Sequence, residues 1–114
     1  MGLAMGIGGL AFDARAAQLV FELKVTNGRV AQDMRIIRVK QGDDVKLRWS
    51  VDRPMTLHFH GYNIEKQVVP GTVGDMAFAA RATGRFPVHA HTTGAQAGGE
   101  GEEVALVYIE VYPQ

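Results

Sequence analysis

The feature that most constrains the fold of this chain is an alternation of apolar and polar residues, interrupted by turn signals, that begins at Leu19. It is clearest in VKLRWSV (45–51), where apolar residues occupy every odd position and polar residues every even position. A period of two is typical of a β-strand that buries one face and exposes the other. No segment has the pattern of an amphipathic helix, so the sequence predicts a protein built of strands.

The alternating segments recur often enough to define a fold class. Turn signals such as Asn27-Gly28 and Pro70-Gly71 separate them, and a glycine-rich loop covers 92–103. Short strands at regular spacing predict an all-β fold, an antiparallel β-sandwich of about eight strands with Greek-key connections. The chain of 114 residues is long enough for one such domain, at 17–114. The expected strands are 19–26, 34–40, 45–51, 57–63, 64–69, 75–81, 85–91 and 104–112.

The N-terminal segment 1–16 differs in composition from the rest of the chain. Its sequence, MGLAMGIGGLAFDARA, is small and apolar and ends in Ala14-Arg15-Ala16, which resembles an A-x-A cleavage site after an apolar core. The positively charged start of a complete signal peptide is missing. The pattern predicts a signal-peptide remnant, export to the periplasm or beyond, and a mature chain that begins near Ala17. The alternative interpretation is an apolar tail that packs on the domain or on a neighbouring molecule.

Composition argues against several classes of function. Twelve basic and twelve acidic side chains cancel, and no basic stripe with interleaved aromatic residues suggests nucleic acid as a partner. No apolar run is long enough to span a bilayer, so no membrane span is expected in the mature chain. The chain has no cysteine, which excludes disulfides, thiolate metal sites and thiol nucleophiles. No Ser-His-Asp arrangement is suggested, so an enzyme is the less favoured interpretation.

The histidines are the strongest functional signal. The chain has four, and all of them lie in two His-x-His pairs within LHFHGYN (57–63) and FPVHAH (86–91). If Leu57 and Phe59 face the core, the first pair must project from the outer surface of a sheet, and the same reasoning applies to the second pair. If the two strands are neighbours, the four imidazoles form one patch. The candidate metal ligands are His58, His60, His89 and His91.

Imidazole nitrogens without a thiolate suit Cu(II), Zn(II) or Ni(II), and the general order of affinities favours copper. Protons compete for the same nitrogens, so metal affinity should fall on acidification. The competing interpretation is a histidine patch without metal that serves as a protein interface. That interface would be a contact between copies of this chain or with an unknown periplasmic protein.

Several segments of the sequence resemble the cupredoxin family, the β-sandwich of blue copper proteins and multicopper oxidases. The likeness covers roughly 18–112 and includes a G-x-F-x-V segment at 84–88. The residues DRPMTLHFHGYNIEKQVVPG followed by TGRFPVHAH resemble small exported cupredoxin-like proteins in particular. The resemblance implies that the two histidine segments pair in one sheet.

Two departures from the family limit what the resemblance implies. A blue copper site needs a cysteine, but Ala90 stands where HAH would read His-Cys-His in a multicopper oxidase. LHFHG resembles the H-x-H-G segment of those oxidases, whose outward histidines bind copper between domains. The oxidases need eight histidines, and this chain supplies four, so an oxidase-like centre would require another subunit. The resemblance therefore implies non-blue copper carriage, buffering or delivery. His58 and His60 match the family pattern most closely, then His91, then His89.

Sulfur and aromatic residues have plainer roles in this interpretation. Met55 and Met76 could offer thioethers to Cu(I), but packing in the core or its connections is the expected role. Trp49 alternates with valine and leucine and is expected to anchor the core.

Overall fold

The strands predicted from the alternation are present in the structure. The computed structural model describes residues 17–92 and 104–114. The predicted signal-peptide remnant at 1–16 and most of the glycine-rich loop fall outside these residues. The eight strands of the described chain are β1 (Gln18–Val25), β2 (Ile36–Lys40), β3 (Asp44–Val51), β4 (Met55–Phe59), β5 (Ile64–Val68), β6 (Gly74–Ala79), β7 (Gly84–Thr92) and β8 (Val104–Tyr112).

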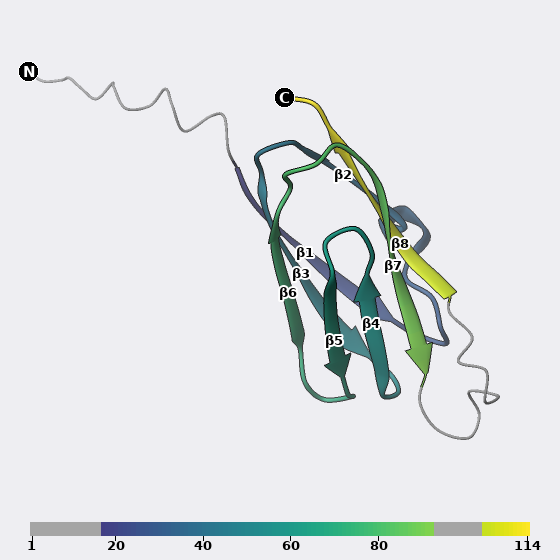
Figure 1. Ribbon diagram of the computed structural model, residues 1–114. Coiled ribbons are helices and arrows are strands. Elements are labelled where there is room, and N and C mark those ends of the chain that lie inside the picture. Colours follow the sequence, from purple (N-terminus) through teal and green to yellow (C-terminus); the bar gives the residue numbers. More distant parts are fainter. Residues whose placement is uncertain (1–16, 93–103) are drawn as a thin grey trace, which may run out of the picture.

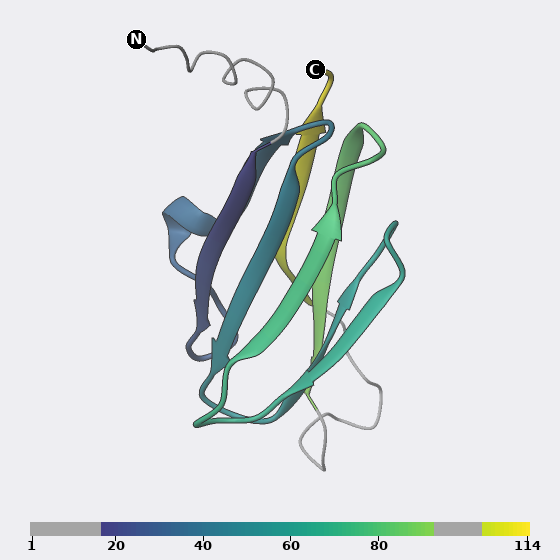
Figure 2. The same cartoon turned by 90° about the vertical axis from the view of Figure 1, so that its left-hand side faces the viewer.

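Two sheets form a sandwich (Figure 1). One sheet has three strands in the order β1-β3-β6, and the other has five in the order β2-β8-β7-β4-β5. Figure 2 shows the purple β1, the blue β3 and the green β6 side by side in one layer. The prediction of an all-β sandwich of about eight strands is therefore confirmed.

The sheets are mixed, whereas the sequence predicted antiparallel pairing throughout. β1 is parallel to β3, and β2 is parallel to β8. The chain passes through the five-stranded sheet as β2 between β1 and β3, so those two strands can run in the same direction side by side. Alternation along a strand says which face is buried but not which strand is its neighbour, so this crossing could not be predicted from it.

The core lies between the sheets and follows the alternation. All four odd-numbered apolar residues of 45–51 are buried, and Trp49, Leu57 and Phe59 are completely inaccessible to solvent. Burial of each large side chain stabilises the fold by roughly 1.5–3 kcal/mol, and a slip of one residue would expose a whole set of them. Met55 and Met76 are 3% and 1% exposed, so their predicted packing roles are confirmed, as is that of Trp49.

Most strand boundaries differ from the prediction by one or two residues, and at two of them the secondary structure of a segment changes. The segment expected as strand 34–40 begins with a short 3-10 helix, Gln32–Met34, and only then becomes β2. The segment expected as strand 57–63 ends as a strand at Phe59, and residues 60–63 form the turn into β5. Positive φ angles at Gly61 (92°) and Asn63 (57°) allow this tight reversal. No helix within the described ranges is long and apolar enough to cross a bilayer.

Candidate metal centre

β4 and β7, the strands that carry the histidines, are antiparallel neighbours in the five-stranded sheet. His58 is the register partner of His89, and Thr56 is the partner of His91. The residues between them, such as Leu57 and Val88, are buried without exposure, so the imidazoles lie on the opposite, outer face. All four histidines are half-buried. The expectation that the two histidine segments pair in one sheet is confirmed.

His60 lies one residue beyond the end of β4, yet it stays over the sheet. Its backbone N–H donates a hydrogen bond of 3.0 Å to the carbonyl oxygen of Pro87, which extends the pairing with β7 past the ladder. Gly61 then turns the chain away with a φ of 92°. A Cβ atom at that position would lie 2.4 Å from Cδ1 of Phe86, so the site requires a glycine on two counts.

The imidazole ring of His60 contacts two other imidazole rings on this face. The ring centroids of His58 and His60 are 4.2 Å apart, and those of His60 and His89 are 4.5 Å apart. Nε2 of His60 and Nδ1 of His89 are 2.9 Å apart, a hydrogen-bond distance at which one neutral ring donates and the other accepts. We call His58, His60 and His89 the histidine cluster.

His91 lies two residues beyond His89 on β7, opposite the first half of β4. Residues two apart on one face of a strand are about 7 Å apart. The sequence ranked His91 ahead of His89, whereas it is His89 that the structure brings against His60. The reason is the antiparallel pairing, in which the end of β4 meets the beginning of the histidine segment of β7.

The donor set fits a metal ion in part. Two nitrogens bound at right angles to one ion, with bonds of about 2.0–2.1 Å, lie about 2.9 Å apart. The His60 and His89 nitrogens already have that separation, 2.9 Å. Within 17–92 and 104–114, however, no group of three or more histidine, cysteine, aspartate or glutamate side chains is arranged to hold a metal ion. A third imidazole would have to turn about its side-chain bonds to join the pair.

Sequence reasoning missed two supports of this site. Tyr62 stacks on Phe59 with ring centroids 4.8 Å apart and meets Phe86 edge-on at 5.1 Å, which braces the turn that carries His60. Glu65 is the register partner of His58 on β5, so it places a carboxylate beside the cluster. The glycine after the first histidine pair was the sequence signal for the turn, whereas nothing in the sequence indicated that β5 follows on the far side of β4.

Of three comparisons with known proteins, the one with solved structures bears on the fold. No protein-family model matches the sequence, and no curated protein matches it either. Among solved structures, a chain of a heme-copper terminal oxidase dimer has a TM-score of 0.63 at 21% identity, over 81% of this chain and 63% of that one. A multi-copper oxidase from Pseudomonas thermotolerans has a TM-score of 0.60 at 23% identity, over 86% of this chain and 30% of the other.

A Cu-containing nitrite reductase from Thermus scotoductus has a TM-score of 0.59 at 17% identity, over 87% of this chain and 28% of the other. The chain thus spans less than two thirds of the length of each of these proteins. At these identities the likeness shows the fold, a cupredoxin-like all-β sandwich, which is the fold that the sequence resemblance implied.

Proposed function

We propose that this protein binds copper through surface histidines, without a blue centre, and carries, buffers or delivers the ion. The observation that supports this proposal is that the ring of His60 contacts those of both His58 and His89 on the outer face of one sheet. His91, next along β7, completes the proposed ligand set.

The chemistry of the donors supports a non-blue site. The chain has no cysteine, so no thiolate can give the short copper–sulfur bond of a blue centre. Ala90, between the two histidines of β7, is 7% exposed and faces the core, where a side chain could not reach an ion held by the outward imidazoles. Bound copper would be coordinated by imidazole nitrogens alone or with solvent and carboxylate oxygens.

One further observation favours cargo over a fixed catalytic metal, and another favours copper over other ions. The imidazoles are half-buried on an open sheet face, so a partner can reach an ion held there. The structural neighbours include a Cu-containing nitrite reductase and a multi-copper oxidase, which favours copper among the ions that imidazole prefers, zinc and nickel included.

Export is part of the proposal, because residues 1–16 resemble the end of a signal peptide. N-terminal sequencing of the protein recovered from the periplasm of an expressing bacterium should give a start near Ala17. An intact N-terminus, or recovery in the cytoplasm alone, would contradict export and leave the metal site to be judged separately.

Copper titration of purified protein tests the metal site directly. Cu(II) should bind with a one-to-one stoichiometry and give a pale complex whose electron paramagnetic resonance spectrum has type 2 character, without an intense blue absorption band. His58→Ala combined with His60→Ala should lower the affinity by about 100-fold or more, since even loss of a supporting contact costs 10–100-fold. Gln67→Ala, on exposed β5 of the same sheet, is the matched control. Equal copper content in the double variant and the control would refute the proposed ligands.

A second candidate function is a metal-free interface between copies of this chain or with another periplasmic protein. It is favoured by the 2.9 Å contact of His60 and His89, which satisfies one nitrogen of each ring without a metal. Sedimentation analysis with copper and with chelator separates the two functions. Self-association that is unchanged by chelator and lost in His60→Ala supports the interface, whereas association that requires copper supports the metal site.

A further inference from the structure

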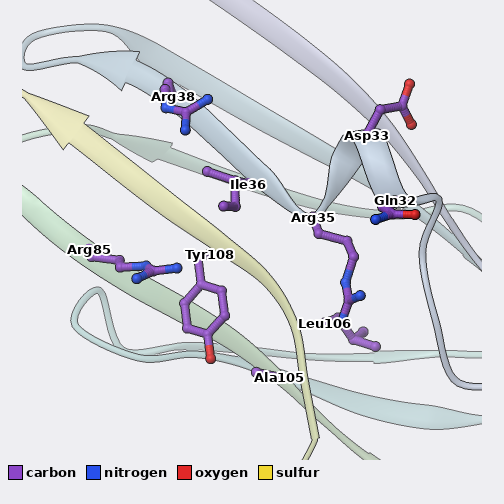
Figure 3. A pocket seen from close by; sticks show the side chains of 9 residues that line it. All are labelled: Gln32, Asp33, Arg35, Ile36, Arg38, Arg85, Ala105, Leu106 and Tyr108. Carbon is purple, nitrogen blue, oxygen red and sulfur yellow. The ribbon is translucent and has the colours of Figure 1, made fainter.

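A groove on the five-stranded sheet gathers three arginines from three separate segments (Figure 3). Arg35 follows the 3-10 helix, Arg38 lies on β2, and Arg85 lies on β7. The groove has a volume of about 430 Å³. We call it the arginine groove; its lining residues used below are Arg35, Arg38, Arg85, Ile36, Leu106 and Tyr108.

Glu110 contacts two of these arginines, and in each of them it contacts only the Nε atom of the guanidinium group. Its Oε1 is 3.2 Å from Nε of Arg38, and its Oε2 is 3.6 Å from Nε of Arg85. The Glu110 side chain is 19% exposed, and the hydroxyl of Tyr112 donates to the same carboxylate at 3.0 Å. Because both contacts use Nε, the terminal amino groups of the two guanidinium groups keep their hydrogen-bonding capacity for a ligand.

The groove carries an excess of positive charge. Arg35 forms no ion pair with the side chains of 17–92 and 104–114. Asp33, at the rim, has its carboxylate turned away from the three guanidinium groups in Figure 3. Among the residues that the structure describes, the carboxylate of Glu110 therefore balances two arginines, and Arg35 has no carboxylate partner. Guanidinium groups bind carboxylates through paired, coplanar hydrogen bonds.

The rest of the lining is apolar, which favours an organic anion over an inorganic one. Ile36, which is 37% exposed, contributes aliphatic surface, and the guanidinium carbon of Arg85 lies over the ring of Tyr108, 4.3 Å from the ring centroid. Inorganic phosphate would leave this apolar surface uncovered, whereas a carbon skeleton would bury it. We propose that the arginine groove binds a small organic anion with two or more carboxylates.

The groove adjoins the histidine cluster on the same face. Ala105, which lines the groove, is the register partner of His89 across the β7–β8 pair. A bound anion would lie beside the proposed copper site, yet its binding depends on the arginines and not on the imidazoles. The proposal therefore stands whether or not the histidine cluster binds copper.

Calorimetric titration with citrate tests the proposal on protein stripped of metal with a chelating resin, so that no soluble chelator competes. Citrate should bind saturably, and Arg35→Gln combined with Arg85→Gln should weaken its binding by about tenfold or more, because charge-assisted hydrogen bonds are lost. Arg48→Gln, which removes an arginine paired with Glu22 and Asp75 on the other sheet, is the matched control and should leave citrate affinity unchanged.

Three results would overturn the proposal. They are citrate affinity unchanged in the double variant, inorganic phosphate binding as tightly as citrate, and a glutamate-rich peptide that displaces citrate with higher affinity through the same arginines. If the double variant does not fold, backbone amide shifts of the wild-type protein decide the matter. Citrate should shift the amides of Ala105, Leu106 and Tyr108, and shifts confined to the three-stranded sheet would overturn the assignment.

Discussion

A glycine next to the histidine cluster sets its geometry at the scale of single residues. Gly61 has a φ of 92°, and a Cβ atom there would lie 2.4 Å from Cδ1 of Phe86. Gly61→Ala is expected to lower the free energy of unfolding by about 2–4 kcal/mol, about 1 from the backbone conformation and the rest from the displaced ring. Copper affinity should fall with it, because His60 is anchored by the same turn.

The control for this substitution is Gly71→Ala. Gly71 has a similar φ of 89°, but a Cβ atom there would meet nothing within 4 Å. Gly71→Ala should therefore lower the free energy of unfolding only by the backbone contribution, about 1 kcal/mol, and leave copper affinity unchanged. Urea unfolding of the two variants measures the difference. Equal decreases in the free energy of unfolding would show that the ring of Phe86 moves aside without destabilising the fold.

Asp52 provides a pH-dependent contribution to stability. Its Oδ2 accepts a hydrogen bond of 2.8 Å from the backbone N–H of Asn27, and this bond, together with the charge of Arg53, lowers the pKa of the carboxyl below its ordinary value. Because the folded-state pKa lies below the unfolded one, the contribution is present above the unfolded value and is lost as pH falls through the folded one.

Asp52→Ala should therefore be less stable than the wild type at neutral pH, and the gap should shrink as the solution is acidified below the ordinary range of an aspartate. Asp52→Asn keeps an acceptor oxygen but cannot ionise, so its gap from the wild type should also close in acid. Chemical denaturation across an acid-to-neutral series measures both gaps. A gap that stays constant with pH would mean that the charge of Asp52 does not contribute.

At the scale of strands, the alternation correctly predicted which face of each histidine strand is buried. It did not predict which strands are neighbours or where a strand ends. It placed His58, His89 and His91 on an outer face, because Leu57 and Val88 had to be buried. It extended the first histidine strand through His60, which the structure places in a turn, since a two-residue period looks the same whether or not the ladder continues. That β4 and β7 are neighbours came from family resemblance and not from the pattern.

The β7–β8 pair contains an irregularity that no local pattern predicts. Val88 pairs with Val107 but His89 pairs with Ala105, so Leu106 is an extra residue on β8. Such a bulge twists the strand locally and re-aims the side chains beside it. The bulge lies where the histidine cluster meets the arginine groove. Leu106 and Val107 are both buried. Both are also apolar residues within an apolar run, so the sequence of β8 gave no sign of the bulge.

The contact between His60 and His89 joins the end of β4 to β7 and can be measured as a coupling energy. In metal-free protein, a double-mutant cycle with His60→Ala and His89→Ala should give a coupling of about 0.5–1.5 kcal/mol in the free energy of unfolding, the usual value of a hydrogen bond. A parallel cycle with His58→Ala and His91→Ala should give less, because the pairing sets His91 opposite Thr56 instead. Coupling of equal size in both cycles would contradict the arrangement of the rings.

At the scale of the whole molecule, folding and ligand binding use different surfaces. The large buried side chains lie between the two sheets, whereas the histidine cluster and the arginine groove lie on the outer face of the five-stranded sheet. No histidine of the cluster and no arginine of the groove belongs to the core; of the groove residues named above, only Leu106 does. The fold can therefore form without a ligand, unlike small domains whose structure depends on a bound metal.

This separation predicts how copper and stability are linked. Protein stripped of metal should keep its β-sheet circular dichroism and unfold cooperatively, because its core does not include the imidazoles. Cu(II) present at about a hundred times its dissociation constant should then raise the free energy of unfolding by about 2.7 kcal/mol, provided that the unfolded chain does not bind it.

The triple variant His58→Ala, His60→Ala, His89→Ala should unfold at nearly the same denaturant concentration with and without copper. Loss of sheet structure on metal removal would show that the ion is part of the fold. Equal stabilisation of the wild type and the triple variant would show that copper binds elsewhere.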